Sequence, residues 1–470
     1  MIITPRQAGP RTGIQQEGRM KNNLLLKGNG YGPAIVLMLL PLFFLLPVSA
    51  AETFEVSRFI DPSVCSGCHS EIHSQWENST HNLSHRDPLY NAVAKYFLKG
   101  LTDAGEIEEA ESCVKCHSPV GVAVGNPQKT SDDLTAVPEI ATFGVQCDYC
   151  HSAVGASRMY NNGIILSPGY GEDDPGIKRG PRKDAEPEFH EAAYSEFHVN
   201  PGICGTCHNV RHVVFLTDLE TTYDEWRNSP YNSRNPEKRV VCQGCHMYQR
   251  PDVPATGSTP RPKNRGFASD IGPERPHVFT HYFVGGNNFM PGLFNGGQDQ
   301  VKMAEERLQN AAVLALDTGD IRNKRFTVTI TNSGAGHKLP TGLSNIRQMW
   351  LDITVTEKAS GRTVFASGQP DENGYLGHDV LLYQTVFGDG QGRSVDNLAK
   401  AREILSDNRI APKKSASQTF RLPEDVPDSG LIITAKLCYR IFSQRLIDQI
   451  AGKDAYDLPV TVMTEIRKNL

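Results

Sequence analysis

The chain has 470 residues, of which 48 are basic and 53 acidic, so its formal net charge is −5. Without the five basic residues and the one acidic residue of the first fifty, 43 basic and 52 acidic residues remain, a formal charge of −9. This balance argues against nucleic acid as a partner. The length suits two domains, and 42 glycines and 30 prolines indicate loop-rich segments.

The first fifty residues have the pattern of a secretory signal peptide. The apolar run 34–48 follows Lys21 and Lys27 and ends at Val48-Ser49-Ala50, which predicts cleavage after Ala50. Met20 is a second candidate start. The run is 15 residues long and contains two prolines, whereas about 20 apolar residues are needed to span a bilayer. An uncleaved membrane anchor is the alternative.

We therefore expect an exported protein that is periplasmic, secreted or held at the cell surface. Contact with a membrane is expected only through a partner or through an uncleaved leader.

Five copies of Cys-x-x-Cys-His follow between residues 65 and 246. This spacing lets two thiols form thioethers to one haem while the histidine binds its iron as the proximal ligand. A zinc ribbon needs no histidine after every pair, and a disulfide framework does not place each cysteine two residues from its partner. A thioredoxin-type motif occurs once per domain. We therefore predict five covalently bound c-type haems.

The haem-binding thiols use ten of the eleven cysteines, in five pairs each followed by its proximal histidine: Cys65, Cys68 and His69; Cys113, Cys116 and His117; Cys147, Cys150 and His151; Cys204, Cys207 and His208; Cys242, Cys245 and His246. Cys438 remains. It lies in the apolar run 431–442, so we predict a buried core thiol.

Residues 51–300 hold all five motifs, an average of 50 residues for each haem. So little polypeptide cannot build an ordinary core around each cofactor. We expect the haems to form the core of a pentahaem cytochrome c domain over 51–300, wrapped by short helices and loops. Within it, the stretch 163–187 is rich in glycine, proline and charge, which predicts an extended surface loop.

Residues 301–316 carry apolar side chains at a helical period, which predicts a connecting helix within 301–320. From residue 325 the period becomes two. Short alternating runs separated by polar turns predict a C-terminal β-sandwich (Ig-like) domain over 321–470, with a boundary near 320. The predicted strands are 326–330, 351–355, 363–366, 416–422 and 431–439.

Ten histidines remain beyond the five proximal ligands, enough to fill every distal position twice. Only six methionines follow the leader, and Met247 directly succeeds its own proximal histidine. This surplus favours bis-His, low-potential haems over His/Met ligation. The candidate distal ligands are His73, His81, His85, His198, His212, His281 and His337.

Two of these candidates lie four residues after a proximal histidine, His73 after His69 and His212 after His208. On a helix that spacing puts both rings on one face, whereas axial ligands approach an iron from opposite sides. Each would therefore reach a neighbouring haem. A solvated helix histidine is the alternative reading of both.

A family resemblance rests on three further stretches. Residues 76–81 (Trp-Glu-Asn-Ser-Thr-His) resemble the Trp-x-x-Ser-x-His element after the first haem of cytochrome c-554-type multihaem cytochromes. That family shares motifs with hydroxylamine oxidoreductase-like and pentahaem nitrite reductase-like cytochromes. The resemblance implies that His81 is a distal ligand. A second copy at 226–231 has Tyr231 where the histidine would stand.

Residues 281–287 resemble the His-x-Phe-x-Gly-Gly-Asn stretch that follows the last haem motif, which implies His281 as a distal ligand. Residues 335–342 are similar to a Gly-His-x-x-Pro-Thr-Gly turn of a C-terminal β-domain. There the resemblance implies that His337 reaches back to a haem and pins the β-domain to the cytochrome. An ordinary turn histidine is the alternative. The resemblance covers most of residues 60–350.

Two departures from these relatives bear on catalysis. The nitrite reductases replace one proximal histidine with lysine, whereas all five motifs here keep histidine. The hydroxylamine oxidoreductase-like enzymes carry more haems and a tyrosine cross-linked to one of them. Tyr223 and Tyr231 are the tyrosines to weigh for such a role, and a structural tyrosine packed on a haem is the favoured reading of both.

We therefore expect an electron carrier, more than a catalytic oxidoreductase, working between donor and acceptor redox proteins that the sequence does not identify. One alternative is an oxidoreductase of nitrite, hydroxylamine or tetrathionate at one haem with an open distal site, first suspected at the Tyr231 element. Another is a structural or docking subunit of an extracellular electron conduit, assembled as a homo-oligomer or filament through strand edges of the β-domain.

Overall fold

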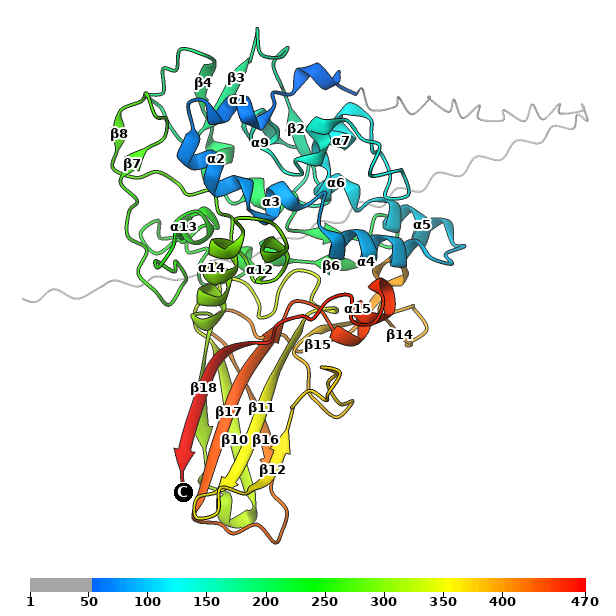
Figure 1. The fold of residues 1–470 in the computed structure, drawn as a ribbon, viewed down its shortest axis with the longest axis vertical. Helices are drawn as coiled ribbons and strands as arrows, with labels where there is room; N and C mark the ends of the chain where they lie inside the picture. The colour runs from blue at the N-terminus through cyan, green and yellow to red at the C-terminus, as the bar shows by residue number, and fades with distance from the viewer. Residues whose placement is uncertain (1–52) are drawn as a thin grey trace, which may run out of the picture. The chain divides into compact units, whose positions relative to one another are not determined.

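Short helices and loops occupy the chain up to about residue 300, and strands dominate after it (Figure 1). The computed structural model describes residues 53–470, which form one compact unit. The predicted signal peptide and its cleavage site lie outside the described residues. Within residues 53–470, no helix has the length and hydrophobicity needed to cross a membrane.

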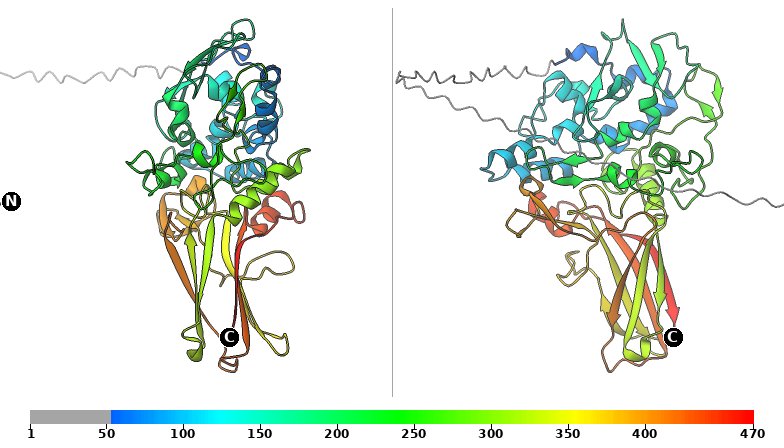
Figure 2. Two further views of the ribbon diagram at one scale, coloured as in Figure 1. Left: turned by 90° about the vertical axis from the view of Figure 1, so that its left-hand side faces the viewer. Right: turned by 180° about the vertical axis from the view of Figure 1, so that it is seen from behind.

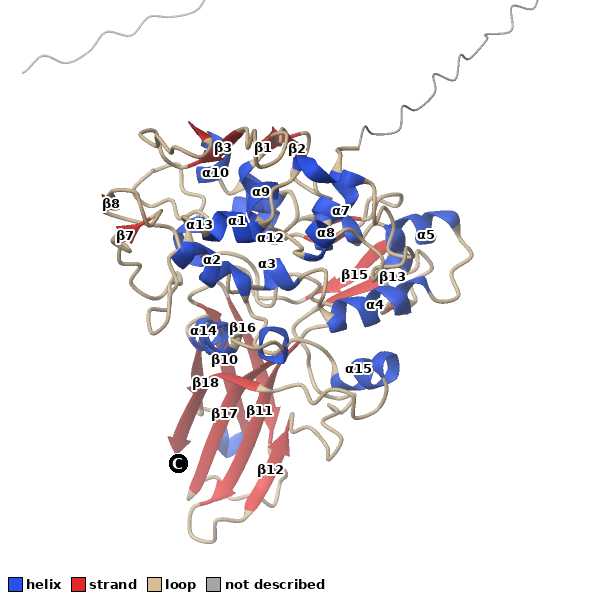
Figure 3. Cartoon of the chain, turned by 45° about the horizontal axis from the view of Figure 1, so that its top comes forward, coloured by secondary structure: helices blue, strands red, loops and turns tan. Residues whose placement is uncertain are grey.

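The helices of the first part are short and separated by loops (Figure 3). They are α1 (Pro62–Ser66), α2 (Ser70–Glu77), α3 (Thr80–Leu83), α4 (Pro88–Leu98), α5 (Ala104–Glu111), α6 (Val114–His117), α7 (Pro119–Val124), α8 (Glu139–Thr142), α9 (Cys147–His151), α10 (Glu196–Val199), α11 (Gly202–Gly205), α12 (Thr222–Arg227) and α13 (Gln243–His246). Single 3-10 turns η1 (Val56–Arg58) and η2 (Met290–Leu293) stand near the two ends of this part.

Aspartate caps begin several of these helices. The carboxylates of Asp61, Asp87 and Asp103 accept hydrogen bonds of 2.8 to 2.9 Å from backbone N–H groups in the first turns of α1, α4 and α5. Such caps satisfy donors that a helix leaves free at its start. The helices can therefore be short and still well defined.

Four small two-stranded ribbons complete the first part. Their strands are β1 (Ala153–Ala156) with β2 (Ile164–Leu166), β3 (Ile177–Gly180) with β4 (Glu191–Tyr194), β5 (Val210–Arg211) with β6 (Asp218–Glu220), and β7 (Gly266–Phe267) with β8 (Glu274–Arg275). The stretch 163–187, predicted as an extended loop, thus contributes two short strands, because β2 and β3 find partners outside it.

The connecting helix is shorter than predicted. Helix α14 spans Gln298–Gln309, and the chain then enters strand β9 at Ala312–Asp317. A single 3-10 turn, η3 (Ile321–Asn323), follows. The prediction of helix through 316 was wrong because the apolar run 312–316 fits a strand equally well, and pairing with β10 (Arg325–Asn332) decides between the two.

Two antiparallel sheets form most of the C-terminal part. One has the order β16–β10–β9 and the other β12–β11–β17–β18. Their strands run side by side in both views of Figure 2. The bounds are β11 (Gln348–Glu357), β12 (Thr363–Ser367), β16 (Ser415–Arg421), β17 (Leu431–Arg440) and β18 (Thr461–Asn469). All five strands predicted from period two are confirmed, while β9 and β18 were not predicted as strands.

A third, smaller sheet of order β14–β13–β15 lies close to α4 and α5 in Figure 3, and α15 (Gln444–Ala451) contacts α4. Its strands are β13 (Thr385–Gly388), β14 (Ser394–Val395) and β15 (Glu403–Asp407), and a 3-10 turn, η4 (Leu398–Lys400), lies between the last two. This segment contacts the helical first part of the chain through Asn397, whose amide donates to the carbonyl of Phe97 at 2.9 Å.

One hydrophobic cluster joins the two larger sheets. Along β10, buried Phe326, Val328 and Ile330 alternate with outward threonines. Phe326 lies 5.4 Å from Phe420 of β16 between ring centroids and edge-on to Phe365 of β12 in the other sheet. The inward faces of both sheets therefore share one core. Cys438 is 3% exposed, which confirms the predicted buried thiol.

Removing one ring from this core should cost several kcal/mol. Phe326→Ala deletes a side chain that is 1% exposed, so we expect a loss of about 3–5 kcal/mol in unfolding free energy. Denaturant unfolding of the holoprotein, followed by circular dichroism, measures it. Thr327→Ala is the matched control, since Thr327 faces outward and such changes cost roughly 0.5 kcal/mol or less. Equal losses in both variants would contradict the shared core.

Candidate haem-binding site

All ten cysteines and five histidines of the five Cys-x-x-Cys-His motifs line one continuous cavity of about 1270 Å³. Apolar side chains of the helical part, among them Val93, Phe97 and Leu219, line it as well. The C-terminal part closes it with residues that include Leu339 and Tyr439. The sequence therefore surrounds a large interior space with the cysteines and histidines that attach haem.

Each motif forms about one helical turn. In four of them the histidine N–H donates to the carbonyl of the first cysteine, at 2.9 to 3.3 Å, and the third motif forms α9 itself. A single turn places both thiols and the imidazole on the same side of the chain. All ten thiols are free. Free thiols in pairs, each beside an imidazole and facing a cavity, fit covalent haem.

The motifs lie beside one another, although they are far apart in the chain. Three pairs of thiols from different motifs lie within hydrogen-bonding reach of each other, and in each pair this contact lowers the pKa of one thiol. The pairs, with the thiol of lowered pKa first, are Cys65 with Cys147, Cys207 with Cys116, and Cys204 with Cys242. The first motif thus neighbours the third, the second neighbours the fourth, and the fourth neighbours the fifth.

Four of the five proximal histidines are oriented by the backbone. Their Nδ1 atoms lie 2.6 to 3.3 Å from carbonyl oxygens, and the pairs are His69 with Ala268, His117 with Ser84, His151 with Arg179 and His246 with Val284. An Nδ1–H that donates to a carbonyl fixes the tautomer and leaves Nε2 for a metal.

His208 is the exception. Its Nδ1 lies 3.5 Å from Oε1 of Glu220 on β6. Burial alone would lower the pKa of His208, but the Glu220 carboxylate raises it to about 9. The proximal imidazole of the fourth motif therefore faces a charged acceptor, where the others face neutral carbonyls.

A second imidazole stands near four of the five proximal rings. Ring centroids are 6.4 Å apart for His69 and His190, 6.5 Å for His151 and His281, 6.2 Å for His208 and His81, and 6.5 Å for His246 and His337. Metal–imidazole bonds are about 2 Å long, so two rings on opposite sides of one ion have centroids roughly 6 Å apart. The four pairs match that spacing.

The protonation state of the second imidazoles also suits a metal. Burial lowers the pKa of His81 and of His281 to about 3, so both rings are neutral, which is the form that binds a metal. At His190, His281 and His337, Nδ1 lies 2.9 to 3.1 Å from a neighbouring carbonyl. Nε2 is thereby left toward the partner ring.

His190 was absent from the distal candidates chosen from the sequence. It follows β3 and immediately precedes β4, 121 residues after His69 in the chain. No motif surrounds it, so spacing gave no reason to prefer it over other spare histidines. The parallel pairing of β3 with β4 belongs to the local fold that carries it to the first motif.

In three other candidate distal ligands, the Nε2 atom lies at hydrogen-bond distance from a backbone carbonyl oxygen. His85 Nε2 lies 3.0 Å from the Leu134 carbonyl, His198 Nε2 lies 2.9 Å from that of Cys150, and His212 Nε2 lies 2.9 Å from that of Ala399. None of the three has a free Nε2, whereas the Nδ1 atoms of His85 and His198 are buried and make no hydrogen bond within the described residues. His198 lines the cavity and its ring centroid is 5.7 Å from that of His151, so it competes with His281 for one position, and the Nε2 that stays free belongs to His281.

His85 and His212 do not line the cavity at all. The assumption that His208 and His212 share a helix was wrong, because residues 210–211 form strand β5. Its Nδ1 instead accepts hydrogen bonds from the N–H groups of Val214 and Phe215, which makes it a structural histidine. His73 does lie on helix α2 and at the cavity, tilted against Trp76 at 5.5 Å between centroids.

The second motif differs from the other four. No second imidazole lies near His117 at the spacing of those pairs in the described residues; instead Tyr90 stacks on its ring at 3.8 Å, with 5° between the planes. Burial is the main cause that raises the pKa of Tyr90 well above its usual range. The Tyr90 hydroxyl is buried, and within residues 53–470 it makes no hydrogen bond of normal geometry, although Thr130 lies near it.

The tyrosines weighed from the sequence have structural positions. Tyr231 is 8% exposed and its hydroxyl donates to the carbonyl of Ser333 at 3.4 Å. Tyr223 packs against Trp226 at 5.9 Å between centroids. Gly336, the residue before His337, lies against the Tyr231 ring, and the His337 ring neighbours that of His246. The Tyr231 element therefore adjoins a site that has two imidazoles.

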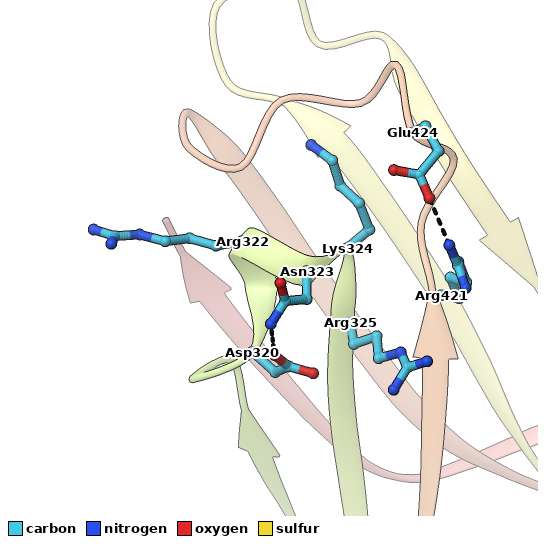
Figure 4. Close-up of a pocket in the computed structure, with 7 residues that line it drawn as sticks. All are labelled: Asp320, Arg322, Asn323, Lys324, Arg325, Arg421 and Glu424. Carbon is cyan, nitrogen blue, oxygen red and sulfur yellow. Dashed lines mark hydrogen bonds and ion pairs between the residues drawn. The ribbon is translucent and has the colours of Figure 1, made fainter.

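A second hollow lies at the far end of the β10–β16 pair (Figure 4). Arg421 pairs with Glu424 at 2.6 Å, and Asn323 donates to Asp320 at 2.5 Å. Figure 4 shows that Arg322 and Lys324 point away from each other, so the side chains do not converge on a common centre.

The cavity, the five motifs and the mainly helical wrapping are the features expected of a multihaem c-type cytochrome. Residues 64–152, which contain the first three motifs, match the family model described as cytochrome c554 and c-prime. The resemblance to c-554-type multihaem cytochromes is thereby confirmed, and it supports covalently bound c-type haems and a role in electron transfer.

The whole fold also has a solved counterpart. The structure is similar to the crystal structure of a penta-heme cytochrome c552 from Thermochromatium tepidum, with a TM-score of 0.59 and 18% identity, over 89% of this chain and 100% of that one. At this identity the likeness concerns the fold. A comparison with curated proteins gave no match.

Proposed function

We propose that this chain is an exported pentahaem c-type cytochrome that passes electrons between redox partner proteins. The observation that carries the proposal is the set of four imidazole pairs at 6.2 to 6.5 Å inside one cavity. Haem supplies the one-electron chemistry. The chain's own residues bind it covalently, orient its axial ligands and keep neighbouring sites close.

The proposed axial pairs are His69 with His190, His151 with His281, His208 with His81, and His246 with His337. Export through the leader 1–50, cleavage after Ala50, and a division near residue 320 between a cytochrome domain and an Ig-like β-sandwich belong to the same proposal. Bis-His ligation favours low potentials, which suits overlapping steps along a chain of adjacent haems.

Spin-state counting tests the ligand assignment. In the oxidised holoprotein we expect four low-spin haems by electron paramagnetic resonance. His190→Ala should convert one of them to high spin, because its iron loses the sixth ligand. His378→Ala is the control, since His378 is exposed and does not line the cavity. An unchanged spectrum in the His190 variant would remove this residue from the proposal.

A second candidate function is reduction or oxidation of a small nitrogen or sulfur oxyanion at the haem of the second motif. The observation that favours it is that, among residues 53–470, no second imidazole stands by His117 at the spacing of the other four pairs. We assign proton delivery at this site to the buried Tyr90 hydroxyl, because it lines the same cavity.

Anaerobic reoxidation of the reduced protein tests this second function, with nitrite, hydroxylamine and tetrathionate as substrates. We expect reoxidation faster than a free-haem control for at least one of them, and slower in Tyr90→Phe, which keeps the ring stack on His117 and removes only the hydroxyl. Rates equal to the free-haem control for all three would retire the catalytic alternative and leave electron transfer alone.

A further inference from the structure

The distal imidazole opposite His246 comes from the other part of the chain. His337 lies in the loop 335–342, between β10 and β11, while His246 ends α13 in the cytochrome part. A ligand carried by a loop needs an anchor, because a small shift of the loop would move the ring out of reach of the iron.

Glu225 of α12 accepts hydrogen bonds from two residues of the loop that carries His337. Its Oε2 accepts the backbone N–H of Lys338, the residue after His337, at 3.0 Å and the hydroxyl of Thr341 at 2.7 Å. The Thr341 hydroxyl also lies 2.7 Å from that of Thr222, next to Glu225 on the same helix. One carboxylate oxygen therefore holds the loop at two points.

The other oxygen of Glu225 is engaged in a buried ion-pair network. Oε1 accepts from Arg409 at 2.6 Å and from the Thr221 hydroxyl at 2.8 Å. Arg409 also pairs with Asp407, which in turn accepts from the side chain of Lys338 at 2.6 Å. The side chains of Glu225 and Arg409 are only 3% and 6% exposed.

The network balances its charges and fills every acceptor position of Glu225. Two cations, Arg409 and Lys338, face two carboxylates, Glu225 and Asp407. Charge-assisted hydrogen bonds in a buried setting are strong and directional. Such a carboxylate has a defined position, so the two loop atoms it holds have one as well.

We propose that Glu225 is a positioning residue for the haem ligand His337: its carboxylate clamps the loop 335–342 onto α12 and so holds the His337 imidazole opposite His246. The inference rests on the axial pair His246 and His337 of the proposed function. It adds that ligation of the fifth haem depends on a contact between the two parts of the chain.

Three variants of the five-haem protein test this clamp. Glu225→Gln keeps the size of the side chain and replaces one acceptor oxygen by a donor, and Thr341→Val removes one clamp contact at constant shape. His337→Ala removes the ligand itself. Arg421→Met is the matched control, since it breaks an exposed ion pair in the same part of the chain. Haem count by mass must be five in every variant.

The readout is the number of high-spin haems, with added imidazole as a probe. We expect one additional high-spin haem in His337→Ala, and partial conversion of the same haem in Glu225→Gln and Thr341→Val, reversed by imidazole. A merely structural role would lower the melting temperature and leave the spin states unchanged.

Two results would overturn the clamp and separate it from the assignment of ligands. If His337→Ala gains a high-spin haem while Glu225→Gln and Thr341→Val do not, the ligand is right and the clamp is wrong. If His337→Ala keeps the wild-type spectrum, the axial pair of the proposed function fails, and the clamp fails with it.

Discussion

The chain produced without haem attachment, with all ten motif cysteines changed to serine, should fail to fold over residues 53–300. The described residues of this part have little core of their own. One buried cluster consists of Phe59, Val120, Ile140 and Tyr149, and the large cluster draws mainly on the strands after residue 310. Short helices cannot close on one another across a wide interior.

The size of the cavity shows why the effect should be large. Unfilled apolar cavities cost about 24 cal/mol for each Å³, so a cavity of about 1270 Å³ would cost on the order of 30 kcal/mol if it stayed empty, which is an upper bound because water can enter its open side. A whole domain is stable by only about 5–15 kcal/mol. Without haem the cytochrome part therefore has no stable closed form.

Hydrogen exchange measured along the chain checks this expectation. Amides of residues 53–300 should exchange freely in the haem-free chain and slowly in the holoprotein. Cys438→Ser is the control, because Cys438 lies in the β core and attaches no haem, so this variant should keep the protection of residues 53–300. Slow exchange across that range in the haem-free chain would mean that the polypeptide alone forms the core.

The second large effect is expected at Glu220. A carboxylate that accepts from the Nδ1–H of a metal-bound imidazole raises the basicity of that ligand, which stabilises the ferric over the ferrous state and lowers the potential. Only His208 among the proximal histidines faces a carboxylate, at 3.5 Å. Burial would raise the pKa of Glu220, but the contact with His208 lowers it, so the group is ionised at neutral pH.

Glu220→Gln should therefore make one haem easier to reduce. We expect roughly a tenfold change in the equilibrium constant of its one-electron reduction, which corresponds to about 59 mV, with the other midpoints nearly unchanged. Spectroelectrochemical titration measures this shift.

The control is Asp218→Asn on the same strand, because Asp218 pairs with half-exposed Arg211 and does not itself line the cavity. If all midpoints of the Glu220 variant coincide with those of the wild type, this carboxylate does not tune the haem of His208.

The haem motifs could be predicted from the sequence because attachment is local: two cysteines and a histidine within five residues specify the chemistry. The pairing of distal ligands could not, since it depends on which loops meet. His190 and His69 are brought together over 121 residues. His81, His281 and His337 were found only because each stands in a stretch that resembles a known element.

The period of the apolar residues predicted a strand correctly where polar and apolar residues alternate, as in β10. It gave the wrong element where no polar residues interrupt an apolar run. Residues 312–316 (Ala-Val-Leu-Ala-Leu) have no polar position that could mark a face. Only the ladder with β10, which pairs Leu314 with Ile330 and Leu316 with Val328, makes them a strand. Strand β18 was missed because its charged residues resemble a solvated tail until β17 pairs with it.

The intact mass of the purified mature protein tests the central claim most directly. The account predicts a polypeptide that begins at Ala51 and carries five haems, with Cys438 as the one thiol left to alkylate after unfolding. A mass with fewer than five haems, or with ten additional alkylated thiols, would contradict it.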